Sequence, residues 1–272
     1  MQAASRESYL AAAGRLSAYA QRAEAATTAE VADEILTVAA LVAREPRLRR
    51  ALADSARAGE ERAELLRSLF TGRASDDALD LLAALVGGRW STPADLLDAT
   101  ERLGADALMA SAERAGKLAD VEDELFRFGQ VVAGDPELAA VLGDSSAGVD
   151  RRAALVRSLL EGKANPVTVR LVEMALAGYG GRGFQASLTR LVELAAQRRD
   201  SSVAYVTAAI LPTDEQEQRL AARLSELYGR EVSLKITVDP RVIGGMSVRV
   251  GSDLFDGTIS RRLAEARNAL AK

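Results

Sequence analysis

The side chains that most often carry enzyme chemistry are missing from this chain, because its 272 residues include no histidine and no cysteine. Their absence excludes a Ser-His-Asp or Cys-His nucleophile, a zinc site built from thiolates or imidazoles, and a disulfide framework. Carboxylate, lysine, serine and backbone chemistry remain.

One pair of carboxylates has a spacing that a metal ion or an acid–base pair could use. Asp253 and Asp256 flank two apolar residues near the end of the sequence. Two carboxylates alone do not make such a site, and their position just before Gly257 and Thr258 fits a turn that starts a helix. No serine and lysine have a spacing that indicates a nucleophile. The sequence therefore offers no positive evidence for catalysis, a cofactor or a metal.

Two glycine-rich segments could be imagined to bind a phosphate. The segment 178–183 lacks the Lys-Ser/Thr of a P-loop and follows a predicted helix rather than a strand, so we favour a turn that ends the helix. Gly244 and Gly245 lie between two predicted strands, where a hairpin turn or a bulge that needs positive φ angles explains both.

Charge and hydropathy argue against nucleic acid and membrane as direct partners. The formal net charge is −4, from 35 Lys and Arg against 39 Asp and Glu, whereas a sequence-independent nucleic-acid binder needs a basic surface. We expect no secretory signal, since Arg6 and Glu7 interrupt the N-terminal segment, and no run of about 18 uncharged apolar residues predicts a membrane span. We expect a soluble protein, and the lack of cysteine is compatible with the cytoplasm.

Composition and length favour helix-on-helix packing in more than one domain. Apolar residues make up 48% of the chain and aromatic residues only 4%, so alanine, leucine and valine must build the core. Such small side chains let helices approach closely. At about 150 residues per domain, the length suggests two domains or three.

An internal repeat organises the first two hundred residues. Shifting the chain by 90 residues aligns 31–72 with 121–162 without a gap, and 17 of the 42 aligned positions are identical. Compositional bias does not hold one register that long. A unit of about 90 residues is too long for a solenoid repeat, so the repeat indicates duplication of a small domain.

Within each unit, apolar residues recur at the three- and four-residue steps of amphipathic helices. Pro46 and Pro136 each follow an acidic residue and open such a run, as proline does in a first helical turn. The first unit repeats the helices of the second about 90 residues earlier, and six short helices with short loops indicate a compact bundle. The helices predicted for the second unit are 102–117, 119–133, 136–142, 149–161, 166–178 and 184–198.

The final third of the chain changes to the period-two pattern of strands, at 203–212, 232–238 and 246–250. Between the first two strands, Thr213 and Gln216 form a capping-box pattern for a helix that ends near Gly229. A last helix is predicted from Thr258, with Ile259, Leu263, Ala266 and Leu270 on one face. The order strand, helix, strand, strand, helix predicts a small α+β domain.

The segment 238–259 closely resembles the C-terminal signature of the F-type ATP synthase delta subunit, the family that includes the mitochondrial oligomycin-sensitivity-conferring protein. The resemblance extends over 101–272, and the additional unit at its front resembles the long bacterial form with a duplicated N-terminal helical domain. We therefore expect a mainly α protein, with helical bundles at 1–100 and 101–199 and an α+β stalk-binding domain at 200–272. The signature positions are Asp239, Pro240, Ile243, Gly244, Gly245, Gly251 and Asp256.

The resemblance implies a non-catalytic stator subunit without a cofactor or metal. In this family the six-helix bundle binds alpha subunits of the catalytic head, and the C-terminal domain holds the b subunits of the peripheral stalk. Contact with beta is a further possibility. The resemblance also implies a peripheral location on the cytoplasmic face of the cell membrane, reached only through the complex, and no nucleic acid as partner.

Helix-in-groove binding of an amphipathic alpha segment would need an apolar surface on one of the bundles. Two homologous stripes are candidates, and each can equally be part of a core: Val121, Glu124, Leu125 and Phe128 in the second unit, and Val31, Glu34 and Ile35 in the first. The alternative functions are a helical adaptor or regulator unrelated to ATP synthase and, more weakly, a carboxylate-dependent enzyme.

Overall fold

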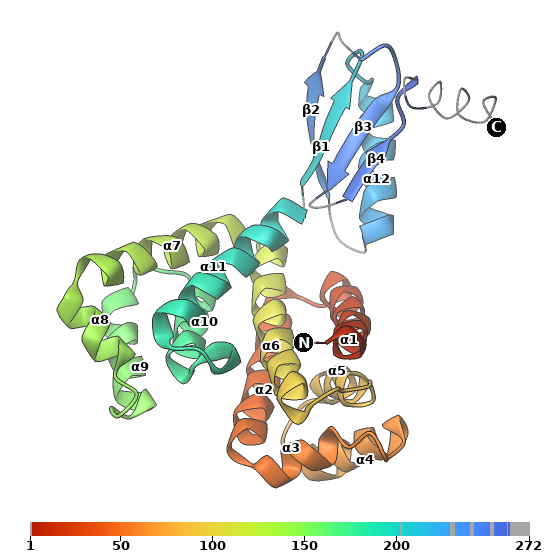
Figure 1. Ribbon diagram of the computed structural model, residues 1–272. Helices are drawn as coiled ribbons and strands as arrows, with labels where there is room; N and C mark the ends of the chain where they lie inside the picture. Colours follow the sequence, from red (N-terminus) through yellow and green to blue (C-terminus); the bar gives the residue numbers. More distant parts are fainter. Residues whose placement is uncertain are drawn as a thin grey trace. The chain divides into compact units, whose positions relative to one another are not determined.

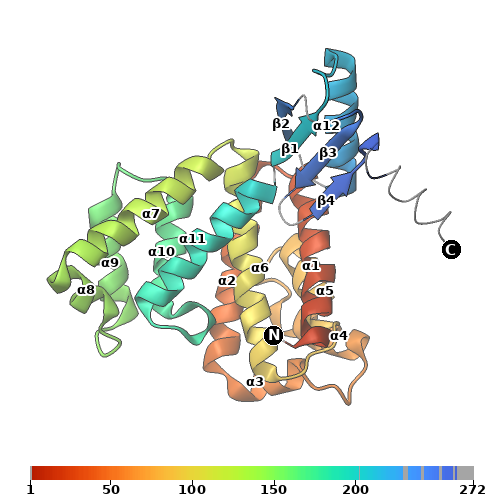
Figure 2. The same ribbon diagram turned by 45° about the horizontal axis from the view of Figure 1, so that its top comes forward.

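The protein is mainly α-helical and divides into two compact units, Met1–Ala195 and Ala196–Lys272 (Figures 1 and 2). The computed structural model describes residues 2–201, 203–228, 232–239, 242–250, 253–259 and 261. A helical unit followed by an α+β unit confirms the fold class expected from the sequence.

The helical unit follows the predicted order of helices closely. Proline stands in the first turn of α3 and α8, as expected for Pro46 and Pro136. Side-chain caps begin several others, for example Ser75, whose hydroxyl accepts from the Ala78 amide at α5. The helices are α1 (Ala3–Arg22), α2 (Ala25–Arg44), α3 (Pro46–Leu52), α4 (Gly59–Phe70), α5 (Asp76–Val86), α6 (Pro93–Arg114), α7 (Leu118–Gly134), α8 (Pro136–Gly143), α9 (Val149–Leu160), α10 (Pro166–Ala177), the 3₁₀ turn η1 (Tyr179–Gly181) and α11 (Phe184–Ser201).

The two repeats share helix α6. The repeat predicts one helix at the end of the first unit and another at 102–117, but a single continuous helix, Pro93–Arg114, takes the place of both. Thr92 caps its start, and Gly116, with φ +67°, follows its end. No proline interrupts the residues between, so nothing stops the helix at the repeat boundary. Helix α6 is therefore the sixth helix of the first repeat and the first of the second, and residues 100 and 101 lie inside it.

One hydrophobic core runs through both repeats, with α6 at its centre. Leu103, Leu108 and Met109 of α6 are fully buried. Helix α6 packs against α1 and α2 of the first repeat and against α7 and α10 of the second. Small residues allow this close packing: a Cβ added to Gly104 would lie 2.4 Å from Leu36 Cδ2 of α2. The alanine-rich composition thus builds a continuous core around a shared helix.

The second unit contains a four-stranded sheet in the order β2-β1-β3-β4. The three predicted strands are confirmed, but a fourth forms where we expected a turn. Asp253 and Asp256 are the first and last residues of β4, which pairs antiparallel with β3. This pairing gives the backbone N–H and C=O groups along that edge of β3 hydrogen-bond partners. The elements are β1 (Val203–Ala208), α12 (Asp214–Tyr228), β2 (Ser233–Val238), β3 (Met246–Val250) and β4 (Asp253–Asp256).

Helix α12 packs against one face of this sheet (Figure 1). Leu224 is buried in a cluster with Val206 of β1 and Val248 of β3. The predicted capping box is confirmed, since the Thr213 amide donates to Gln216 Oε1 at 3.0 Å and the Gln216 amide donates to Thr213 Oγ1 at 3.3 Å. Of the predicted last helix, Ile259 is helical, whereas Leu263, Ala266 and Leu270 lie outside the described residues, as does Gly229.

Candidate functional site

The apolar residues of the two predicted partner-binding stripes lie in the interior. Val31, Ile35, Val121, Leu125 and Phe128 are all at most 6% exposed. They belong to the helical core, where neighbouring helices already cover them. Of the two interpretations of these stripes, the structure supports core, because these apolar side chains are not open to a partner.

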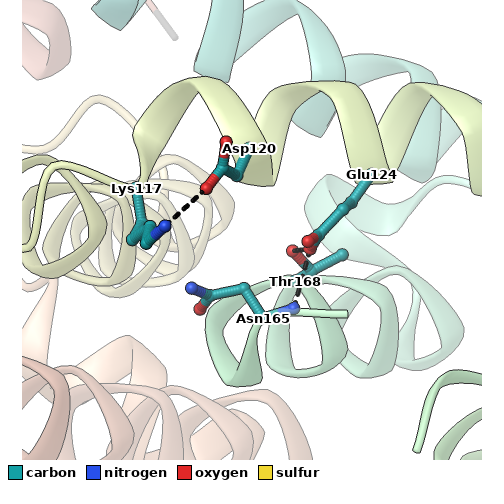
Figure 3. A network of polar contacts seen from close by, with 5 residues as sticks. All are labelled: Lys117, Asp120, Glu124, Asn165 and Thr168. Carbon is teal, nitrogen blue, oxygen red and sulfur yellow. Dashed lines mark hydrogen bonds and ion pairs between the residues drawn. The ribbon is translucent and has the colours of Figure 1, made fainter. Parts of the chain in front are cut away.

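The two glutamates of these stripes hold the start of another helix. Glu124 accepts a hydrogen bond from the Asn165 amide at 2.8 Å and another from the Thr168 hydroxyl at the start of α10 (Figure 3). In the first repeat, Glu34 accepts from both the amide and the hydroxyl of Ser75, which caps α5. A carboxylate is favourable beside the positive end of a helix dipole. The repeated glutamate therefore fixes the position of one helix relative to another.

The signature residues build one end of the sheet in the second unit. The Asp239 amide donates to the Ala208 carbonyl at 3.0 Å, and the Ile259 amide donates to the Gly244 carbonyl at 3.0 Å. Gly245 has a φ of +79°, and a Cβ there would lie 2.4 Å from the Gly257 carbonyl oxygen. Gly245 therefore has the predicted positive φ, and only glycine fits this close approach. The same prediction is wrong for Gly244, which has no positive φ.

Two further predictions concern Asp256 and the other signature residues. Asp256 Oδ1 accepts from the Thr258 amide at 3.0 Å, so this carboxylate has the predicted turn role although it also ends β4. Hydrogen bonds from the Thr258 side chain and from the Thr258 amide hold the pKa of Asp256 below its usual value. Pro240 and Gly251 lie outside the described residues.

Large apolar side chains are exposed at this same end of the sheet, which we call the apolar end. The strand register brings them together, because Ala208 at the end of β1 pairs with Val238 at the end of β2 and with Met246 at the start of β3. Exposed apolar side chains that gather at one place can mark a binding surface. The members of the apolar end are Ile210 (78% exposed), Leu211 (71%), Val238 (44%), Ile243 (73%) and Ile259 (43%).

Of these residues, sequence reasoning singled out Ile243 only through the family resemblance. The predicted strand 203–212 includes Ile210 and Leu211, which precede Pro212, but β1 ends at Ala208. Proline cannot donate a backbone hydrogen bond to a neighbouring strand, so Pro212 indicates that the strand ends nearby. The two bulky apolar residues before it can then be exposed.

A groove lies between the repeats in the helical unit, with a volume of about 980 Å³. One wall is a single face of α2, which includes Leu36, Ala40 and Ala43, and the opposite wall comes from α9 and α10. Small side chains on both walls keep the groove open. We call it the inter-repeat groove, and its opposite wall includes Val149, Ala153, Met174 and Ala177.

Charged pairs are also among the residues that line the inter-repeat groove. Asp33 of α2 forms an ion pair with Arg170 of α10 at 2.7 Å, and Arg157 of α9 forms one with Glu173 of α10 at 2.5 Å. Burial raises the pKa of Asp33, and the Arg170 charge opposes that shift. A groove lined by both apolar and charged side chains suits an amphipathic helix. The sequence gives no signal for this groove, because its α2 wall lies at residues 33–44 and its opposite wall at residues 149–177, far apart along the chain.

The described residues also bear on metal and membrane binding. Among them, no three Asp or Glu side chains gather in a way that could hold a metal ion. None of the helices in the described part of the chain is both long and apolar enough to cross a bilayer.

Comparison with known proteins shows that the matching family model and two similar relatives carry the same subunit name. A family model described as ATP synthase delta (OSCP) subunit matches residues 101–270. ATP synthase subunit delta of Salinispora arenicola is 62% identical over 273 residues, which cover 100% of both chains. The protein of the same name from Streptomyces griseus subsp. griseus is 45% identical over 271 residues, again 100% of both chains. A chain of the Toxoplasma gondii mitochondrial ATP synthase hexamer aligns with 62% of this chain and 95% of its own length, at 19% identity and a TM-score of 0.33.

Proposed function

This chain belongs to the ATP synthase delta (OSCP) subunit family, and from that premise we propose that it is a stator subunit of a rotary ATP synthase. The observation that carries the proposal is the 62% identity to a delta subunit over the full length of both chains. In this role the protein links the catalytic head to the peripheral stalk, so that the head does not turn with the rotor. It performs no catalysis and reaches the cytoplasmic face of the membrane through the complex.

The N-terminal segment of alpha binds, in this proposal, in the inter-repeat groove. The apolar residues of the predicted stripes on α2 and α7 are buried, whereas this groove is lined by apolar side chains of α2, α9 and α10 together with charged ones. An amphipathic helix would place its apolar face on Leu36 and Met174 and its polar face toward the Asp33–Arg170 pair.

Filling the groove tests this assignment. Ala40 and Ala43 are exposed on α2, so Ala40→Trp or Ala43→Trp should leave the fold intact and occupy the space a partner helix needs. We expect at least tenfold weaker binding of an alpha N-terminal peptide, measured by titration calorimetry on the full chain. Ala18→Trp, at an exposed position of α1 outside the groove, is the matched control. Unchanged binding by both groove variants would exclude this groove as the alpha site.

The b subunits of the stalk bind, in this proposal, at the apolar end of the C-terminal unit. Burying this surface would remove several large apolar side chains from water, at roughly 25 cal/mol per Å². The signature residues form the turns from which these apolar side chains extend. The residues that carry the family resemblance therefore have a structural role at this surface.

Charged substitutions at the apolar end test stalk binding. Ile243→Asp and Leu211→Asp alter side chains that are more than 70% exposed, so the fold should tolerate them. We expect loss of b from the copurified complex while alpha is retained. Leu227→Asp, at a 64% exposed position near the opposite end of α12, should keep b bound. If both variants at the apolar end retained b, the b subunits would have to bind at another surface.

The stator role itself is tested by coupling. Membranes depleted of this subunit should regain proton-driven ATP synthesis when the full chain is added back. The Ile243→Asp variant should restore synthesis poorly while ATP hydrolysis by the head continues. Failure of the unaltered chain to bind or couple the complex would refute the proposal.

A further inference from the structure

A second cavity lies where the two repeats meet, with a volume of about 390 Å³. We call it the junction cavity. It is built by α1 of the first repeat, the shared helix α6, the turn η1 and α11 of the second repeat. Its polar lining includes Arg6, Tyr9, Arg102, Tyr179, Arg182 and Arg190.

The lining carries an excess of positive charge. Four guanidinium groups from different parts of the chain line the cavity, and Asp98 is the only carboxylate among the described lining residues. Arg190 Nη1 forms an ion pair with Glu193 Oε2 at 2.8 Å, and Arg102 Nε lies 4.0 Å from Asp106 Oδ2.

Two of these arginines, Arg6 and Arg182, form no close ion pair within the described residues. The Arg182 charge still acts on two nearby carboxyl groups, since it opposes the rise in pKa that burial causes at Asp98 and at Glu101. Glu101 also accepts from the Gly180 amide at 2.7 Å. The four lining arginines outnumber the one lining carboxylate, and a bound anion would reduce the repulsion among their charges.

Two of the lining arginines are held in place by the fold. The Arg102 guanidinium lies over the Tyr9 ring, 4.6 Å from its centroid, and the Tyr9 hydroxyl donates to Asp106. The buried Nε of Arg102 has no hydrogen-bond partner. Arg182 folds back over the glycine turn, where a Cβ on Gly180 would lie 2.2 Å from Arg182 Nη1.

We propose that the junction cavity binds an oxyanion of the phosphate class. A tetrahedral anion presents oxygens in several directions, which suits guanidinium groups that converge from separate elements better than a planar carboxylate would. The volume lies within the range of small-ligand sites. The glycine-rich segment 178–183 contributes to anion binding by positioning Arg182. Its backbone does not surround the anion as a P-loop does. The bound anion joins α1 to the second repeat and so stabilises the junction.

Titration calorimetry on the full chain tests the site. Inorganic phosphate is titrated at constant ionic strength, with sodium chloride as the balancing salt. The salt then screens unspecific binding to surface charges to the same extent at every phosphate concentration. We expect one saturable site. Arg6→Gln and Arg182→Gln, which alter exposed side chains, should each weaken phosphate binding about tenfold. Arg15→Gln, at another exposed position of α1, should bind like the unaltered protein.

A second titration uses adenosine diphosphate to distinguish a nucleotide from free phosphate as the ligand of the cavity. Tighter binding than inorganic phosphate, with the same dependence on Arg6 and Arg182, assigns the cavity to a nucleotide; weaker binding assigns it to free phosphate. A phosphate-dependent rise of the unfolding temperature that Arg182→Gln abolishes would support the site independently. Absence of saturable binding of both ligands, or equal binding by the Arg6→Gln/Arg182→Gln double variant, overturns the proposal.

Discussion

Glu124 connects α7 to the start of α10, and its charge should matter more than its size. Glu124→Gln keeps an acceptor for the Asn165 amide but removes the charge beside the helix dipole. We expect the free energy of unfolding to fall by about 1–2 kcal/mol, measured by urea denaturation. Asp123→Asn removes only an exposed ion pair with Arg127 and should cost at most about 0.5 kcal/mol. Equal losses would contradict a special role for Glu124.

Glu101 should make the stability of the helical unit depend on pH. Burial raises the pKa of its carboxyl group, and the hydrogen bond from the Gly180 amide only partly opposes this. The carboxyl therefore binds its proton more tightly in the folded state, so stability falls as pH rises from the usual glutamate range through the raised pKa.

The amide of Glu101→Gln can still accept from Gly180 but carries no charge to bury. We expect the free energy of unfolding at pH 7 to be equal to or above that of the unaltered protein, with the gain disappearing at acid pH. Denaturation at a series of pH values measures this. A loss of stability confined to neutral pH would show that the ionised carboxylate is favourable.

Among the elements, α2 and α6 depend on a glycine at their crossing. Gly104→Ala would improve helix propensity by about 1 kcal/mol, but the new methyl would meet Leu36 Cγ at 2.6 Å. Overpacking costs about 1–3 kcal/mol, so we expect a net loss of stability in thermal or urea unfolding. Gly14→Ala in α1 meets no atom within 4 Å and should instead stabilise the protein by up to about 1 kcal/mol. A gain at both positions would contradict the tight crossing.

Most elements could be predicted from local signals, and the exceptions have physical reasons. Pro46, Pro136 and the Thr213 capping box act within a few residues, so they indicate helix starts without any tertiary information. Strand β4 could not be predicted in this way. Its four residues carry no clear alternation, and the partner that makes it a strand is β3.

For the whole molecule, the shared helix makes the two repeats one cooperative unit. Leu108 of α6 is fully buried, so Leu108→Ala should cost about 2–5 kcal/mol. We expect amide hydrogen exchange to lose protection in helices of both repeats, while β1 and β3 keep theirs. Loss confined to one repeat would show that the repeats unfold independently, as the predicted division at residue 100 implies.

Val206→Ala provides the reciprocal control in the second unit. Its side chain is 1% exposed within the sheet cluster, so the substitution should cost about 1–3 kcal/mol. Protection should fall in the sheet and remain unchanged in α2 and α10, because the chain divides into two compact units. Parallel loss in the helices would indicate one cooperative unit for the entire protein.

The amino-acid sequence by itself determined the repeat, most helix starts, the strand-rich final third and the family, because each depends on residue type and spacing along the chain. Tertiary structure decided which apolar stripes are covered. Val121 and Val31 have the pattern of an amphipathic surface, yet neighbouring helices bury both. It also decided that α6 serves both repeats, and it brought Arg6 to Arg182 and Ile210 to Ile243. Periodicity along one segment shows that a face is apolar, but what lies against that face depends on segments far away in the chain.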